Sequence, residues 1–149
     1  MGDSIVAEQS RVNQRKQGDK VTRTVGHLSA RYVPDFSERK PPLALDIVPA
    51  GKPGAIKAFY KGQPLPKAKL ELISESGWKR ELKTDAQGAL VVALPRRGNY
   101  VIEVEHFDAT GGTRGSEAYE SMRLVTTLSF RVADGGEAPP TPPVYTPKR

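Results

Sequence analysis

Between residues 54 and 132, short segments of alternating apolar and polar residues are separated by turns that contain glycine or proline. In residues 67–73, Ala68, Leu70 and Leu72 occupy alternate positions, and lysine or glutamate lies between them. Because successive side chains of a strand point to opposite faces, this pattern predicts a strand with one buried face. Several such strands at regular spacing predict an all-β fold, a single antiparallel β-sandwich of about seven strands.

The other strands of the sandwich are predicted from the same signals. We expect strands over residues 55–60, 78–84, 89–94, 100–106 and 123–132, with the apolar segment 89–94 in a central position. The glycine-rich segment 111–115 precedes a strand and not a helix, which favours a hairpin over a phosphate-binding loop. The predicted core comprises Leu70, Leu72, Val92, Ile102, Val104, Leu128 and Phe130.

Both flanks of this region are poor in apolar residues. We expect residues 11–20 to form a loop or arm, residues 21–32 a strand, and residues 43–48 an edge strand. The run Ala138–Pro143 favours polyproline II conformation. The chain is therefore predicted to consist of a polar N-terminal arm (1–40), a sandwich domain (41–133) and a proline-rich tail (134–149). The flanks are expected to bury little by themselves and to engage a protein partner or a multi-subunit assembly.

Composition excludes several classes of protein. The chain has no cysteine, so disulfides and thiolate metal sites are impossible. No segment approaches the roughly 20 apolar residues of a membrane helix, and residues 1–10 lack the basic start and apolar core of a signal peptide. The net charge of +6 is spread along the chain, which argues against nucleic-acid binding.

Several motifs resemble those of known families. The segments 62–72, Thr84-Asp85-Ala86-Gln87-Gly88, and Gly98 followed by Tyr100 resemble the carboxypeptidase-regulatory, transthyretin-like sandwiches. With residues 33–36, 45–49, 105–108 and 119–130, the chain is similar to a bacterial periplasmic family, domain of unknown function 4198, whose members are often associated with nickel and cobalt uptake. The resemblance implies a periplasmic location and a metal-handling role, although the family's signal peptide and histidine-bearing N-terminal domain are absent from this sequence.

A metal site could be built around one of the two histidines. His106 lies near Glu103, Glu105 and Asp108 in sequence, and a mixed imidazole–carboxylate site suits nickel, cobalt or zinc. The alternative is that His106 lies at the edge of the core and hydrogen-bonds a loop carbonyl, which a single histidine without closely spaced partners favours.

Partner-binding candidates are Trp78, Arg96, Arg97 and Tyr145. Trp78 follows a turn and is either a partly exposed anchor for a partner or a core residue. No nucleophile motif is present, so an enzyme is the least favoured class. The sequence thus predicts a non-enzymatic binding or scaffold module, with a periplasmic metal-handling accessory as the alternative.

Overall fold

The computed structural model describes residues 4–137, and in that range every regular element is a β-strand. The prediction of an all-β protein is confirmed. The strands are β1 (Ile5–Gln17), β2 (Lys20–Tyr32), β3 (Leu45–Pro49), β4 (Ala55–Tyr60), β5 (Gln63–Pro64), β6 (Lys69–Ser74), β7 (Lys79–Lys83), β8 (Ala89–Val91), β9 (Gly98–Asp108), β10 (Gly112–Arg114), β11 (Glu117–Tyr119) and β12 (Ser121–Val132). The described residues contain no helix long and apolar enough to cross a membrane.

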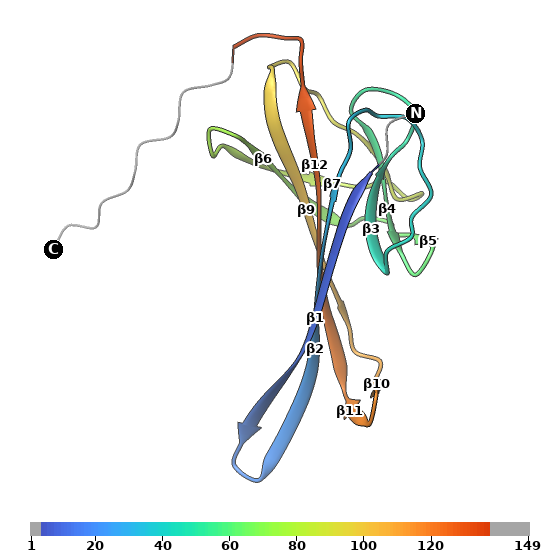
Figure 1. Cartoon of the computed structure of the whole chain (residues 1–149), viewed down its shortest axis with the longest axis vertical. Helices are drawn as coiled ribbons and strands as arrows, with labels where there is room; N and C mark the ends of the chain where they lie inside the picture. The colour runs from blue at the N-terminus through green and yellow to red at the C-terminus, as the bar shows by residue number, and fades with distance from the viewer. Residues whose placement is uncertain (1–3, 138–149) are drawn as a thin grey trace, which may run out of the picture.

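The strands form three sheets (Figure 1). A six-stranded sheet has the order β1-β2-β12-β9-β6-β7, and β3, β4, β5 and β8 form a four-stranded sheet. A separate hairpin joins β10 to β11. The expected single sandwich of about seven strands is therefore too simple. The described residues form more strands because the N-terminal segment adds β1 and β2, and short pairings within loops add β5, β10 and β11.

The six-stranded and four-stranded sheets share one hydrophobic core, so the fold is sandwich-like. Leu70, Ile102 and Leu128 come from the larger sheet, whereas Leu45 and Ile56 come from the smaller one, and all five are at most 1% exposed. The seven predicted core residues all belong to this cluster, which confirms the face assigned to β6, β9 and β12. Alternation therefore predicted the buried face correctly wherever one side of a strand faces water.

Two predicted segments differ from the structure. Residues 11–20, expected to be a loop or arm, form parts of β1 and β2. Pairing along the whole hairpin satisfies those backbone groups that face the partner strand, and every side chain there except the half-buried Val12 is exposed. Segment 89–94, expected to be a central strand, contains only the three-residue β8, which pairs with β4 alone among the described strands and leaves Val91 76% exposed.

Residues 1–40 also contribute more to the core than predicted. Strand β2 lies between β1 and β12, and it pairs in parallel with β12 over Thr24–Tyr32. Val25 and Val33 are buried, and Val33 belongs to the central cluster. The expectation that this segment buries little by itself is therefore wrong for its second half, which is an integral part of the larger sheet.

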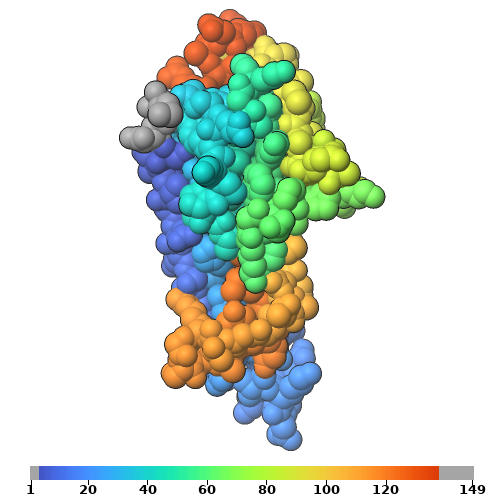
Figure 2. Space-filling model, turned by 90° about the vertical axis from the view of Figure 1, so that its right-hand side faces the viewer, coloured from blue at the N-terminus to red at the C-terminus, as the bar shows by residue number. Residues whose placement is uncertain are grey.

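The β1–β2 hairpin extends well beyond the body of the molecule (Figures 1 and 2). Pairing between β2 and β12 begins at Thr24, so residues 14–23 lie past the end of β12. A two-residue turn closes the hairpin, and Gly18 takes a positive φ of 59° at its first position, where glycine is favoured. The sequence thus builds a two-stranded ribbon that only its own cross-strand pairs support near the tip.

Candidate binding surfaces

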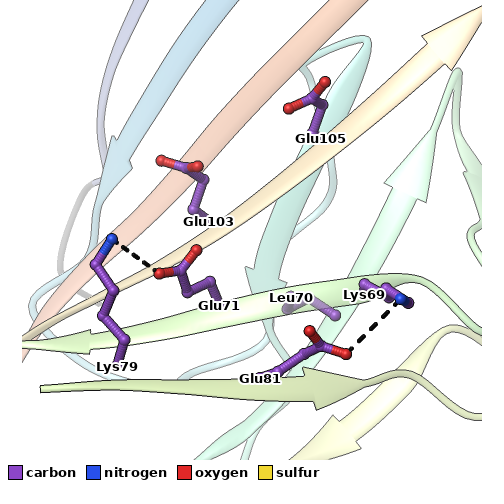
Figure 3. A pocket seen from close by; sticks show the side chains of 7 residues that line it. All are labelled: Lys69, Leu70, Glu71, Lys79, Glu81, Glu103 and Glu105. Atoms are coloured by element: carbon purple, nitrogen blue, oxygen red, sulfur yellow. Dashed lines mark ion pairs between the residues drawn. The ribbon is translucent and has the colours of Figure 1, made fainter.

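An acidic pocket lies on the outer face of the six-stranded sheet (Figure 3). Glu71 on β6 is directly opposite Glu81 on β7 and Glu103 on β9. Like charges in this arrangement repel one another. Two lysines offset the repulsion: Lys79 Nζ lies 3.0 Å from Glu71 and Lys69 Nζ lies 3.9 Å from Glu81. The pocket is therefore a mixed, solvated charged surface.

Glu105, which also lines this pocket, is engaged by a neighbouring strand. Arg123 on β12 donates two hydrogen bonds to its carboxylate, of 2.8 and 3.0 Å. These bonds hold the pKa of Glu105 below its ordinary value. Of the four residues proposed as metal ligands, Glu103 and Glu105 thus lie on the outer face of the sheet.

His106 and Asp108 lie on the opposite face of β9 from these glutamates. The His106 ring packs against the Tyr60 ring with centroids 4.3 Å apart, and the Tyr60 hydroxyl donates a hydrogen bond to Asp108. Lys61 Nζ is 3.6 Å from the same carboxylate. The bond from Tyr60 holds the pKa of Asp108 well below its usual range, and burial together with Asp108 raises the pKa of Tyr60.

The proposed ligand set is therefore divided into two pairs on two faces of β9. Within residues 4–137, no group of three or more histidine, cysteine, aspartate or glutamate side chains is arranged to hold a metal ion. His106 and Asp108 both contact Tyr60, one through its ring and the other through its hydroxyl. The predicted strand over residues 100–106, with Ile102 and Val104 in the core, already implied that residues 103 and 105 lie on the opposite face from residue 106. The extension of the strand to Asp108 was not predicted.

A second hollow, of about 280 Å³, lies where β6 and β7 approach the segment before β9. Its lining includes Trp78, Tyr100, Pro95 and Arg96, and we call it the aromatic groove. Trp78 is 49% exposed, so of its two predicted placements, partly exposed or in the core, the structure has the first. Tyr100 is buried and donates a 2.7 Å hydrogen bond to the carbonyl of Arg96, which fixes one wall of the groove.

The other partner-binding candidates are placed differently. Arg97 is exposed, and its backbone N–H donates to the carbonyl of Gly136, outside the aromatic groove. Tyr145 lies outside the described residues. The structure therefore brings Trp78 and Arg96 together and leaves Arg97 beside them on the adjoining loop.

The most extensive exposed feature is one that the sequence pattern did not identify. Strand β1 has 13 residues and, among the described strands, pairs with β2 alone, so its other edge is open; we call this the β1 edge. Exposed apolar side chains follow it on one face: Ile5 (69% exposed), Leu28 (52%) and Tyr32 (43%). Ile5 on β1 is directly opposite Tyr32 on β2, and Ala7 is directly opposite Ala30. Ala30 lies between Leu28 and Tyr32 on the same face of β2.

The tip of the hairpin is basic. Over residues 14–23 it carries Arg15, Lys16, Lys20 and Arg23, with Asp19 as its single acid. Its base is held in place by the Arg23 backbone, which exchanges hydrogen bonds with the side chain and the backbone of Glu120. We call residues 14–23 the basic tip. These ten contiguous residues carry a net charge of +3, half of the chain's +6, so the charge is less evenly spread along the sequence than expected.

Comparisons with protein-family models, with curated proteins and with solved structures found no match.

Proposed function

We propose that this chain is a non-enzymatic binding module of the transthyretin-like sandwich kind, which presents the β1 edge and the basic tip to a protein partner or a multi-subunit assembly. The observation that carries the proposal is the open edge of a 13-residue strand. An edge strand presents a row of backbone donors and acceptors on which another strand can pair. Protein recognition by strand addition uses such edges, with main-chain hydrogen bonds for affinity and alternate side chains for specificity.

The half of β1 nearest the sandwich is suited to this role. Natural edge strands are usually protected by prolines, bulges or frequent charges. Residues 5–10 contain no proline and a single charged side chain, Glu8, and they pair with β2 without a bulge. A strand added there would place its alternate side chains beside Ile5 and Ala7, where they would cover exposed apolar surface.

The basic tip indicates the chemistry of the rest of the partner. The end of the hairpin that carries these charges protrudes from the body of the molecule (Figure 2), where an acidic surface could contact it. Complementary charge of this kind mainly accelerates association and weakens with salt. We therefore expect the partner to offer an extended segment with alternate apolar residues, next to a region rich in aspartate and glutamate.

The transthyretin-like assignment is supported by local hydrogen bonds that the motif residues make. The Thr84 hydroxyl accepts a hydrogen bond from Ala68 N–H and donates one to the Leu65 carbonyl, both 2.8 Å long. Asp85 Oδ1 accepts from the N–H groups of Gln87 and Ala89. Tyr100 bonds back to the backbone four residues upstream, as tyrosine corners do in other sandwiches. The periplasmic location implied by the resemblance is part of the same proposal.

The test is photo-crosslinking in the native host. A photoreactive amino acid at Ala7, on the β1 edge, should capture one protein reproducibly, whereas the same residue at the highly exposed Val91 of β8 should not. Ala7→Lys should reduce recovery of that protein, because it places a charge where the added strand would pack. Val91→Lys is the matched control and should leave recovery unchanged. Equal recovery with Ala7→Lys, or capture from position 91 alone, would contradict the proposal.

A further inference from the structure

The aromatic groove lies beside the point where the described chain ends. Gly136 pairs with Arg96 as an isolated parallel bridge, and the Arg96 Nη1 donates a 2.7 Å hydrogen bond to the carbonyl of Glu137. Arg96 itself lines the groove. The chain is therefore held at the rim of the groove by the residue that forms part of its wall.

The twelve residues after Glu137 have a composition that suits this groove. They read Ala-Pro-Pro-Thr-Pro-Pro-Val-Tyr-Thr-Pro-Lys-Arg, with four prolines among the first six. Proline-rich segments are recognised in grooves lined by aromatic side chains, where little conformational entropy is lost. At about 3.1 Å per residue, an extended segment of this length reaches roughly 37 Å, which is ample for a groove that starts at its anchor.

The hydrogen-bonding groups of the groove match those of a proline-rich segment. Proline lacks an N–H, so such a segment offers mainly carbonyl acceptors. The groove offers donors on the side chains of Arg80 and Arg96, above an apolar floor of Leu72 and Tyr100. Residues 138–147 carry no charge, so they bring no cation against these basic groups.

We infer that the aromatic groove is the docking site of the chain's own proline-rich segment, residues 138–147, bound within the same molecule. The anchor at Arg96 keeps the segment at high effective concentration, so each individual contact can be weak. A proline-rich segment of a partner would compete for the same groove. This inference is independent of the β1 edge and stands or falls separately from the proposed function.

Trp78 is the sole tryptophan of the chain, so its fluorescence reports on the groove directly. In the full chain, we expect Trp78 to be protected from acrylamide. Replacing Pro139, Pro140, Pro142 and Pro143 by serine should shift its emission to longer wavelength and increase quenching. Lys148→Ser with Arg149→Ser, outside the proposed segment, should change neither. These substitutions alter no residue of the described strands, so we expect the same circular dichroism spectrum from both variants.

A synthetic peptide of residues 138–147, added to the four-serine variant, should restore the emission with saturable binding. Arg96→Ala in the full chain should weaken protection, because the anchor for Glu137 is lost. Identical quenching of the full chain and the four-serine variant would overturn the inference. Protection that disappears on dilution would also overturn it, since the bound segment would then come from a second copy.

Discussion

Arg31 on β2 and Asp46 on β3 form a bidentate ion pair that joins the two sheets from inside the core. The guanidinium donates hydrogen bonds of 3.1 and 2.7 Å to the two carboxylate oxygens, and the two side chains are 3% and 0% exposed. Asp46 also accepts a hydrogen bond from the N–H of Leu43. The pair fixes how β2, and with it the β1 edge, is placed against the smaller sheet.

Breaking this ion pair on one side should be strongly destabilising. Asp46→Ala leaves the Arg31 charge buried without its counter-charge, and such changes typically cost about 3–5 kcal/mol. The double variant Arg31→Met with Asp46→Leu removes both charges and should lie much closer to the unchanged chain in urea unfolding. If Asp46→Ala cost no more than the double variant, the pair would not hold the sheets together.

Side-chain truncations on the two faces of β12 should differ in their effect on the free energy of unfolding. Phe130 is 2% exposed and stacks with Tyr100 at 5.7 Å between ring centroids, so Phe130→Ala should cost about 3–5 kcal/mol in unfolding free energy. Thr127→Ala, on the outer face of the same strand, is the control and should cost far less. Equal losses would place the strand one residue out of register.

The Tyr60–Asp108 hydrogen bond should make stability depend on pH in a defined window. The pKa of Asp108 is lowered in the fold, so its contribution is present above the ordinary value of 3.8 and is lost as pH falls below it. The pKa of Tyr60 is raised, so its contribution is full below 10.0 and is lost as pH rises above it. Tyr60→Phe should therefore destabilise the chain at neutral pH.

Urea unfolding across that range is the measurement. The difference between the unchanged chain and Tyr60→Phe should be largest between pH 3.8 and 10.0 and should shrink on either side. Tyr32→Phe removes a hydroxyl from an exposed tyrosine on β2 and should give a small difference without this window. A Tyr60→Phe difference that does not vary with pH would show that the bond is not what sets these two pKa values.

Metal titration tests the alternative function that the family resemblance implies. We expect no saturable heat with nickel, cobalt or zinc at micromolar concentration, because Tyr60 and Lys61 already engage Asp108 and the two glutamates lie on the other face of β9. A single saturable site that His106→Ala abolishes would contradict this expectation and favour the metal-handling role.

The sequence predicted those parts of the fold in which one strand face is buried. Alternation located β6, β9 and β12 and assigned Leu70, Ile102 and Leu128 to the core, because burial on one face leaves a period of two. It failed for residues 11–17 of β1, where every side chain except that of Val12 is exposed and no period marks the strand. The parallel pairing of β2 with β12 joins residues 97 positions apart and has no local signal.

The candidate surfaces were harder to predict than the core. Trp78 and Arg96 were selected individually, but the groove that they share depends on the packing of two segments 18 residues apart in sequence. The four proposed metal ligands lie within six residues, yet strand parity divides them between two faces. The β1 edge is open because no other described strand pairs with that side of β1. A local sequence pattern does not show which strand of a sheet lies at its edge.

Hydrogen exchange at the amides of β1 tests the central claim most directly. In an edge strand paired on one side, alternate amides are hydrogen-bonded and the others point to solvent. The free chain should therefore show alternating slow and fast exchange along residues 5–17. In the complex with the protein captured from position 7, the fast amides should become slow as well, first over residues 5–10. Unchanged exchange along β1, with new protection at the opposite edge strand β7, would contradict the account.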